Sequence, residues 1–544
     1  MKTCTLDIET NLSHNGIWCV VTKVEGEDPI LHRDVSTLPS PDEYIYVAHY
    51  GMGFDFPTLA RLWDWAVPLD NQVDTILLSK MYDTNVPGGH SLKNLAEVYV
   101  KTQLKTEFAK ERFDEGYSEE MGAYCIQDVV VLERLYQELA SRMMLWDGDA
   151  IRMEHTVRAL TNEQQRNGFK LDVGRTNALY TELHSRRNTL TNLLQRSFPP
   201  IVHQRWSEKT GKRLADRVEE FNPGSRTQIA RRLEGLGVRW TKKTEKGNLV
   251  VDETTLSKHK AIPEAAMCLE YLTMGKKASM VEGWLKHVGD DGRVHGSVDT
   301  LGAVTARMTH SKPNVAQADS DHDTRSCWTV EDGNRLVGVD ASGLELRMLA
   351  HYMNDPDYSD LILTGDIHTY NQKAAGLETR DQAKTFIYAF LYGAGDAKIG
   401  SIIGKGGAAG KAMKERFLSN TPALAALREK VTRIASQGSV PGLDGRRIRV
   451  RHEHAALNTL LQSAGAIVMK RALVIGYETL TLTDIWHLLV AQVHDEIQSE
   501  TKANTAEAVG QAYIEGIVKA GEYYDMRIPL AGEAKIGKTW AETH

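Results

Sequence analysis

Three stretches in a fixed order decide the fold of this chain: LVGVDASGLELR at 336–347, RDQAKTFIYAFLYG at 380–393 and AQVHDEIQSE at 491–500. The first is an apolar run that ends on Asp340, and the third is an apolar run that ends on Asp495. Short apolar runs of this kind are typical of buried strands. The middle stretch predicts a helix with basic and aromatic residues. Two distant strands that each deliver a carboxylate, with such a helix between them, suit metal-assisted phosphoryl transfer on a nucleotide.

Length and composition describe an ordinary globular protein. A chain of 544 residues is too long for one core, so about two to four domains are expected. No stretch approaches the roughly 18 apolar residues of a membrane span, and MKTCTLDIET has acidic residues where a signal peptide needs apolar ones. The five cysteines are scattered without CxxC spacing, which indicates reduced thiols. We therefore expect a cytoplasmic protein without a membrane partner.

The net charge of −7 does not by itself favour nucleic acid, but DNA binding requires only a local basic track. Two runs could form such tracks, although any single basic run is more often a solvated face. The candidate cations are Arg446, Arg447, Arg449 and Arg451 in the first run, and Lys405, Lys411, Lys414 and Arg416 in the second.

The N-terminal region contains a second set of spaced carboxylates. Asp7 and Glu9 stand two residues apart in an expected strand, so both point to one face. Asp55 follows a glycine-rich turn and precedes an expected helix. Tyr124 and Asp128 are four residues apart on an amphipathic helical stretch and share a face. Each acid alone would be a surface residue or a helix cap, but two like charges on one strand face favour a cation between them.

In this order the N-terminal acids resemble the ExoI, ExoII and ExoIII motifs of DEDD-type 3′–5′ exonucleases. The resemblance implies that Tyr124 orients the attacking water. Tyr50 departs from the Asn that is usual in the second motif, and Asp74 is expected to be structural. The resemblance to these exonucleases also implies two Mg²⁺ ions held by four carboxylates: Asp7, Glu9, Asp55 and Asp128.

The three C-terminal stretches are similar to motifs A, B and C of family A DNA polymerases, the polymerase I type, and most closely to those of podophage replicative enzymes. The implied fold class is α/β multidomain, with an RNase H-like exonuclease domain followed by a right-hand polymerase domain. The expected boundaries are 1–147 for the exonuclease and 148–544 for the polymerase, divided into thumb (about 148–290), palm (about 291–352 and 441–544) and fingers (about 353–440).

The resemblance also assigns a catalytic centre to the two later strands. Asp340, the backbone oxygen of Ala341 and Asp495 would hold two Mg²⁺ ions, for which Mn²⁺ is an expected substitute. Glu496 is counted among the catalytic residues because it belongs to the same motif. The expected reaction is attack of a primer 3′-OH on a nucleoside triphosphate.

The middle helix is expected to bind the incoming nucleotide. Arg380, Lys384 and Tyr388 drift by about 40° per four-residue step and therefore form one inclined stripe. The cations suit the β and γ phosphates, and the aromatic ring suits the base. By resemblance, His368 also touches the triphosphate and Tyr392 stands beside the templating base.

Further substrate contacts follow from the resemblance alone. Glu345 would crowd the sugar 2′ position and hydrogen-bond to Tyr388, which makes the pocket specific for deoxyribonucleotides. Ala306 and Ala389 replace residues that are usually glycine. The remaining contacts to the primer–template are assigned to Arg307, His494, Asn458 and Gln462.

The thumb segment at 198–220 has only 23 residues. Some relatives carry a long basic loop at this place, on which thioredoxin docks as a processivity factor. We therefore expect no dependence on thioredoxin. Lys276 and Lys277, on another expected thumb helix, would contact duplex DNA. The short segment itself contains Trp206, Lys209, Lys212 and Arg213, which suit either a duplex contact or a solvated connection.

The expected substrates are primer–template DNA and dNTPs, and a helicase–primase and a single-strand binding protein are candidate partners. No 5′-nuclease domain is expected, because the first strand begins near residue 3.

Two alternatives stay open. A single-subunit phage-type RNA polymerase shares the palm and the basic helix, and dNTP against NTP use would separate it. A catalytically inactive DNA-binding scaffold would fail to extend a primer. A phage origin would place the protein in the bacterial host's cytoplasm.

Overall fold

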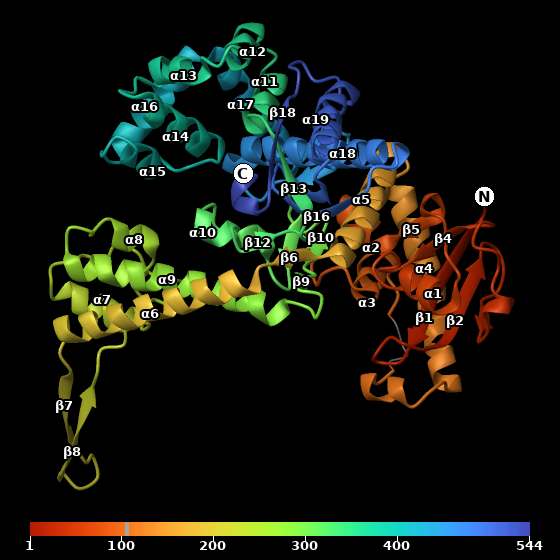
Figure 1. Ribbon diagram of the computed structural model, residues 1–544, viewed down its shortest axis with the longest axis horizontal. Helices are drawn as coiled ribbons and strands as arrows, with labels where there is room; N and C mark the ends of the chain where they lie inside the picture. The colour runs from red at the N-terminus through yellow and green to blue at the C-terminus, as the bar shows by residue number, and fades with distance from the viewer. Residues whose placement is uncertain (104–107) are drawn as a thin grey trace.

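The N-terminal part is built on a five-stranded mixed sheet. The computed structural model describes residues 1–103 and 108–544, and it is shown in Figure 1. The sheet order is β3-β2-β1-β4-β5, in which β1 is antiparallel to β2 and parallel to β4. Helix α4 (Glu119–Arg142) packs on β1 and β2. The strands are β1 (Thr3–Thr10), β2 (Ile17–Val24), β3 (Ile30–His32), β4 (Ile45–Ala48) and β5 (Gln72–Asp74), and the short helices are α1 (Asp55–Trp63), α2 (Thr75–Tyr82) and α3 (Leu92–Leu95).

A second sheet, the palm sheet, carries the two expected catalytic strands. Its order is β16-β17-β13-β18, and every pair in it is antiparallel. Gly338 in β13 has no room for a side chain, because a Cβ there would lie 2.4 Å from the backbone oxygen of Thr543. The strands are β13 (Asn334–Ala341), β16 (His487–Val493), β17 (Glu496–Lys502) and β18 (Gly532–Gly537). Helix α19 (Ala506–Tyr523) packs on this sheet, and α18 (Ala456–Leu482) packs on α19.

The expected fingers are entirely helical and lie on one side of the palm sheet (Figure 1). Helix α11 (Leu344–Met353) leads from β13 into them. Helix α14 begins with a capping box, in which Thr379 caps the Gln382 amide and the Gln382 side chain returns to the Thr379 backbone. The helices are α12 (Pro356–Leu363), α13 (Ile367–Ala375), α14 (Arg380–Leu391), α15 (Asp396–Ser401), α16 (Gly407–Asn420) and α17 (Pro422–Ala435), followed by the hairpin β14 (Ser439–Pro441) and β15 (Arg447–Arg449).

The expected thumb is an arm that extends from the palm below the fingers in Figure 1 and consists of two long helices, α6 (Val173–Ser197) and α9 (Pro263–His287). Its far end has a separate core, which includes Phe198, Phe221 and Leu233. Short elements there are β7 (Ile201–Trp206), β8 (Arg213–Glu219), α7 (Arg226–Glu234) and α8 (Glu253–Ser257). Small strands and one short helix join the arm to the palm: β6 (Phe169–Leu171), β9 (Arg293–Val294), β10 (Ser297–Asp299), β11 (Thr309–Ser311), α10 (His322–Arg325) and β12 (Trp328–Thr329).

Helix α5 (Gly148–Asn167) joins the N-terminal part to the palm. Its Glu154 carboxylate is bonded by Lys470 of α18 at 2.8 Å, and its His155 accepts the Asp74 amide at 3.0 Å. One continuous hydrophobic core therefore extends from the first sheet through α5 into the palm and fingers. Helix α18 is long and apolar enough to span a membrane, but 83% of its apolar stretch is buried within the protein, as in the core helix of a globular domain.

Candidate active sites

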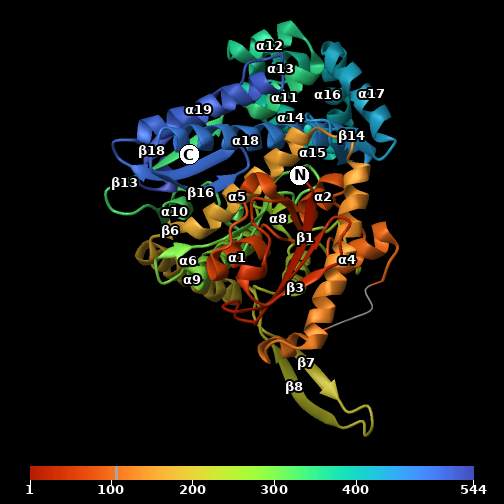
Figure 2. The same ribbon diagram turned by 90° about the vertical axis from the view of Figure 1, so that its right-hand side faces the viewer.

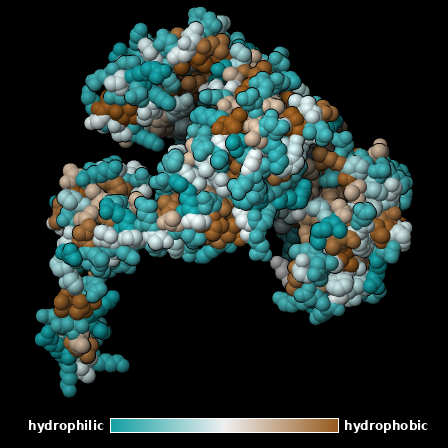
Figure 3. Space-filling model, viewed as in Figure 1, coloured by the Kyte–Doolittle hydropathy of each residue, from teal (hydrophilic) through white to brown (hydrophobic). Residues whose placement is uncertain are grey.

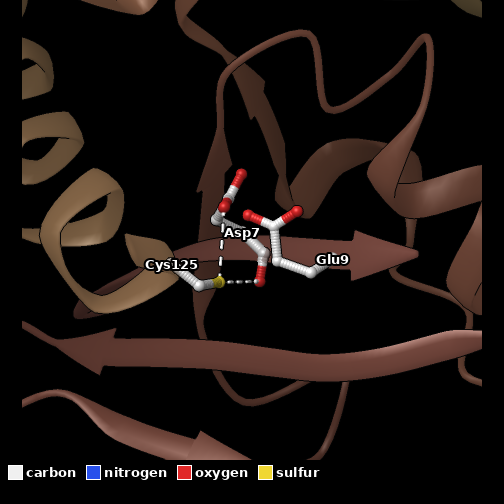
Figure 4. A group of neighbouring side chains, drawn as sticks. All are labelled: Asp7, Glu9 and Cys125. Carbon is white, nitrogen blue, oxygen red and sulfur yellow. Dashed lines mark hydrogen bonds between the residues drawn. The ribbon is translucent and has the colours of Figure 1, made fainter. Parts of the chain in front are cut away.

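The first candidate site lies on β1, where strand alternation places Asp7 and Glu9 on the same face. One potential ligand atom from each of Asp7, Glu9 and Cys125 lies within 4.8 Å of the others. Figure 4 shows the two carboxylates side by side on the strand, with the thiol approaching from α4. Asp55, at the start of α1, is 3% exposed, and Asp128 of α4 is 8% exposed. The four acids predicted from the sequence thus all stand on elements that pack around β1.

Burial raises the pKa of every acid in this cluster, and repulsion by neighbouring acids adds to the shift of Asp7, Glu9 and Asp55. Desolvation and the neighbouring Asp128 raise the pKa of Asp7 to about 7. Desolvation and Asp7 raise the pKa of Glu9 to about 10 and that of Asp55 well above its usual range. Burial raises the pKa of Asp128 to about 6, opposed by a hydrogen bond from the Tyr124 hydroxyl. These acids repel one another in their ionised forms, so a cation is the natural counterpart of the cluster.

The Asp128 carboxylate tests whether this cluster suits a bound cation. Its Oδ1 atom is buried and has no hydrogen-bond partner among the described residues. A buried carboxylate oxygen without a donor is costly, and a hard divalent cation satisfies it. The donor set therefore fits Mg²⁺ or Mn²⁺.

Cys125 is a neighbour of this cluster that the sequence reasoning missed. Its thiol donates to Asp7 Oδ2 at 3.4 Å and to the Asp7 backbone oxygen at 3.6 Å (Figure 4). Its position in the sequence could have revealed it. Cys125 lies three residues before Asp128 on the same helix, so the two side chains share a face.

Asp74 is structural, as expected. It is 2% exposed, and its carboxylate accepts the backbone amides of Tyr50, Met52 and Ile76 at 3.1, 3.2 and 2.9 Å. Tyr50 itself adopts a left-handed backbone conformation, with φ of 65°. Its ring lies under the Arg158 guanidinium, 5.5 Å from the ring centroid, which fixes this unusual residue at the border with the palm.

The second candidate site is formed by β13 and the turn between β16 and β17. Asp340 lies opposite Glu496 in the antiparallel register, and the Ala341 amide donates to the Asp495 backbone oxygen at 3.1 Å. Burial and the charges of Asp495 and Glu496 raise the pKa of Asp340 to about 7. The predicted strand–turn–strand is confirmed, with His494 in a left-handed conformation at the turn (φ of 57°).

Glu496 differs from the two aspartates because protein groups already surround its carboxylate. It is 4% exposed. Its oxygens accept hydrogen bonds from Trp540 Nε1 at 2.5 Å, Arg325 at 3.4 Å and Gln498, and a His544 ring nitrogen lies 3.1 Å away. The side chain is thus held by the C-terminal residues rather than free to take a ligand.

Cations gather opposite these carboxylates on the fingers. Arg380 and Lys384 are exposed on α14, and their charges, together with burial, lower the pKa of His368 on α13. Its Nδ1 atom is buried without a hydrogen-bond partner in the described part of the chain. The Tyr388 ring centroid lies 6.5 Å from that of His368. Two cationic side chains beside a histidine with an unpaired ring nitrogen fit a polyanionic ligand.

The position of Glu345 corrects one expectation. Its carboxylate accepts a hydrogen bond from the Tyr392 hydroxyl, whereas Tyr388 was expected to bond to it. Arg307 lies 3.6 Å from the same carboxylate. The difference arises because Tyr392 is the C-cap of α14, so its side chain leaves the helical stripe and reaches the first turn of α11.

Comparison with known proteins identifies the family of this chain and the type of each of its two catalytic domains. Residues 202–542 match the family model described as DNA polymerase family A, and residues 37–144 match the one described as 3′–5′ exonuclease. The DNA-directed DNA polymerases of Enterobacteria phage T3 and Escherichia phage T7 are each 34% identical, over 92% of this chain and 92% of the relative. The chain belongs to DNA polymerase family A. It is a DNA-directed DNA polymerase with a 3′–5′ exonuclease domain, which sets aside the RNA polymerase alternative.

The fold of this family A polymerase is also found in a solved structure. The protein described as "POL domain of Pol1 from M. smegmatis complex with DNA primer-template and dNTP" superposes with a TM-score of 0.82. The match covers 99% of this chain and 95% of that chain, at 19% sequence identity. The expected α/β multidomain fold, with the exonuclease first, is therefore confirmed.

Each of the two expected basic tracks loses one cation to contacts within the protein. Arg446 is 1% exposed and is paired with Asp444 and Glu154, both at 2.6 Å, so it is a core residue and not a DNA contact. Lys414 donates to the Ala394 carbonyl oxygen at 2.6 Å and is paired with an acid of α15.

Both basic tracks keep other cations exposed, whereas one of the two expected thumb lysines is paired. Lys277 is paired with Asp321 at 2.8 Å, so its charge is partly neutralised. The exposed cations are Arg447, Arg449 and Arg451 in the first track and Lys405, Lys411 and Arg416 in the second, and Arg449 is paired with Asp83 at 2.8 Å.

The remaining predicted contacts lie near the second site. Asn458 and Gln462 are half-buried and one turn apart on α18. Arg307 and His494 line one small cavity of about 20 Å³. Ala306 has φ of 58°, a conformation that favours glycine, so the replacement noted in the sequence keeps the backbone of that turn and carries strain of about 1 kcal/mol.

Proposed function

We propose that this chain is a replicative DNA polymerase of a bacteriophage, which extends a primer 3′-OH with dNTPs and proofreads with its own exonuclease. The observation that carries the proposal is the presence of two separate carboxylate sets, one on β1 and one on β13 and the β16–β17 turn. The similarity to the T3 and T7 enzymes over 92% of each chain supports the phage origin. The boundaries proposed above follow this division, and 147/148 falls between α4 and α5.

Each carboxylate set is proposed to hold two Mg²⁺ ions. In the exonuclease the ligands would be Asp7, Glu9, Asp55 and Asp128; in the polymerase they would be Asp340, Asp495 and the Ala341 carbonyl oxygen. When bound, the ions activate the attacking oxygen and stabilise the leaving oxygen. Tyr124, whose hydroxyl is bonded to Asp128, orients the attacking water of the exonuclease.

The protein's own groups position the nucleotide. Arg380 and Lys384 bind the triphosphate with their charges, and the unpaired ring nitrogen of His368 adds a hydrogen bond. Tyr388 stacks on the base. The Glu345 carboxylate, held by the Tyr392 hydroxyl, lies against the sugar. It excludes a ribonucleotide by steric contact with the 2′-hydroxyl and by repulsion between the carboxylate and the hydroxyl oxygen.

The duplex is read from its minor groove by a second group of side chains. Base pairs of correct geometry present acceptors at equivalent minor-groove positions, so donors there test pairing without reading sequence. The proposed readers are Arg307, His494, Asn458 and Gln462. Glu496, whose oxygens are already bonded, acts as a positioning residue that fixes the turn carrying Asp495.

We further propose that the enzyme works in the host bacterial cytoplasm with a helicase–primase and a single-strand binding protein, and without thioredoxin. Primer extension with Mg²⁺ and dNTPs tests the central activity. Extension followed by 3′ degradation when dNTPs are withheld supports it. A folded protein that binds primed DNA but neither extends nor degrades it would instead be an inactive scaffold.

A further inference from the structure

The feature with no assigned role is the hairpin of β7 and β8 at the far end of the thumb, called here the thumb hairpin (residues 201–219). Figures 1 and 2 show it standing clear of the rest of the chain in both views. Its turn is closed by the Ser207 amide, which donates to the Lys212 carbonyl oxygen at 2.9 Å, and by the Gly211 amide, which donates to Ser207 at 2.8 Å. The segment is therefore a formed element and not an irregular loop.

The thumb hairpin exposes apolar side chains instead of burying them. It is tied to the thumb at its base, where a His203 ring nitrogen lies 2.8 Å from the Glu219 carboxylate, which Arg231 also binds. Two-stranded hairpins are marginally stable in water unless something packs on them. Figure 3 shows hydrophobic surface on this element. The exposed apolar side chains are Val202 (57%), Trp206 (59%), Leu214 (41%) and Val218 (57%).

The thumb hairpin has an excess of basic side chains, which indicates a negatively charged partner. Positions 205–217 carry five basic and two acidic side chains, in a chain whose net charge is −7. Arg213 is paired with Asp216 at 3.1 Å. No described carboxylate lies within 4.0 Å of the side-chain nitrogens of the other four cations: Arg205, Lys209, Lys212 and Arg217.

The cations are combined with an aromatic ring. Trp206 is directly opposite Arg213 in the strand register, so indole and guanidinium share one face of the hairpin. Arg213 is paired with Asp216, but the unpaired cations Arg205, Lys209 and Lys212 stand on the same strand as Trp206 or in the turn that follows it. Cations near an exposed aromatic side chain are typical of surfaces that bind the nucleic acid backbone and the sugar or base edges beside it. A protein partner is less favoured, because four unpaired like charges would each need a matching acid.

We propose that the thumb hairpin binds the product duplex behind the primer end, with its cations on backbone phosphates and Trp206 covering an adjacent deoxyribose. This inference rests on the proposed polymerase function for the identity of the DNA. It adds a distant grip that limits dissociation between nucleotide additions and takes no part in the chemistry.

The fold gives this grip a definite reach. The 25-residue helix α6 separates β6, beside the palm, from the thumb hairpin. At 1.5 Å per residue the helix spans about 37 Å, which corresponds to about 11 base pairs at 3.4 Å each. A duplex much shorter than that cannot reach from the palm to the hairpin. The contribution of the hairpin should therefore appear only on long duplexes.

Two variants remove the contact in different ways. The first replaces residues 203–217 by Asn-Gly, which can close a two-residue turn because Val202 and Val218 are directly paired. The second carries Arg205→Ala, Lys209→Ala, Lys212→Ala and Arg217→Ala. The matched control removes four exposed cations from another thumb segment: Arg239→Ala, Lys242→Ala, Lys243→Ala and Lys246→Ala.

The measurement is the affinity for primed duplexes of about 10 and about 25 base pairs, as a function of salt concentration. We expect the unaltered enzyme and the control to bind the longer duplex about tenfold or more tightly than the shorter one. Both hairpin variants should lose that gain, and their salt slope on the long duplex should fall by about 0.9 for each phosphate contact removed.

Single-nucleotide extension on the short duplex shows whether each variant is folded and active. Hairpin variants that keep the full gain and salt slope would overturn the proposal and leave a protein partner as the better explanation. Failure of the unaltered enzyme to extend any primer would refute the proposed polymerase function. The binding comparison would still decide whether the hairpin contacts duplex DNA.

Discussion

Asp340 and Glu496 are direct partners across the antiparallel ladder of β13 and β17, yet their environments differ. Asp340 keeps an exposed surface near the end of β13, while partial burial of its carboxyl and two neighbouring acids raise its pKa to about 7. Glu496 is enclosed by Trp540, Arg325 and Gln498. One register pair thus supplies both an acid that needs a cation and an acid that braces the turn beside it.

Proofreading should be separable from synthesis, because β1 and β13 belong to different sheets. Asp7→Ala with Glu9→Ala should lower degradation of a single-stranded 3′ end by roughly 10³-fold or more and leave extension unchanged. Release of nucleotides from a labelled primer measures the first activity. Degradation at the original rate would show that the cluster on β1 is not the exonuclease site.

The exonuclease acids should destabilise the protein when no metal is present. The pKa of Glu9 is raised to about 10, so the unfolded state loses this proton first, and stability falls as pH rises from about 4.5 toward 10. In chelator at pH 8, Glu9→Gln should therefore stabilise the fold by about 1 kcal/mol or more, seen as a higher unfolding temperature. Mg²⁺ should raise the unfolding temperature more in the unaltered protein than in the variant.

The matched control for that measurement is Glu97→Gln, an exposed glutamate of the same domain. It should change neither the unfolding temperature nor the Mg²⁺ response. Equal behaviour of the two variants would contradict the assignment of Glu9 to a metal cluster.

Chain terminators should be accepted readily because position 388 is tyrosine. In the proposed binding mode the Tyr388 hydroxyl lies close to where the 3′-OH of a dideoxynucleotide is missing. Tyr388→Phe should therefore raise discrimination against dideoxynucleotides by roughly tenfold to a hundredfold. Competition between dNTP and ddNTP in primer extension gives the ratio. Tyr370→Phe, which removes a fingers hydroxyl bonded to the Asn420 carbonyl oxygen, should leave it unchanged. An unaltered enzyme that already rejects ddNTPs strongly would show that α14 is misassigned.

Thioredoxin should have no effect on product length. The segment expected to be too short for a docking loop forms only the thumb hairpin. Extension of a long primed template should give the same product lengths with and without added thioredoxin. Longer products on its addition would show that a hairpin of this size suffices as a docking element.

Much of both sites could be predicted from the sequence, because the carboxylates lie in short local motifs. Asp340 and Asp495 end apolar runs, and Asp7 and Glu9 alternate on one strand. The failures all depend on distant parts of the chain. Arg446 belongs to a basic run, but its partner Glu154 comes from α5, far away in sequence.

The same limit applies to the residues that surround the acids. The enclosure of Glu496 by Trp540 depends on where the C-terminal residues fold, which no motif encodes. Tyr392 replaces Tyr388 beside Glu345 because α14 ends at that point, and helix ends are set within one or two residues by tertiary contacts. Packing, more than local pattern, decided each of these details.

The most direct test of the account is a paired assay of Asp495→Asn. Primer extension and single-strand 3′ degradation are measured on the same preparation, with Asp340→Asn as a second variant. We predict that both variants lose extension by roughly 10³-fold or more and keep the exonuclease rate of the unaltered enzyme. Loss of both activities in a folded Asp495→Asn protein, or extension that persists in it, would contradict the claim that the chain contains two independent metal sites.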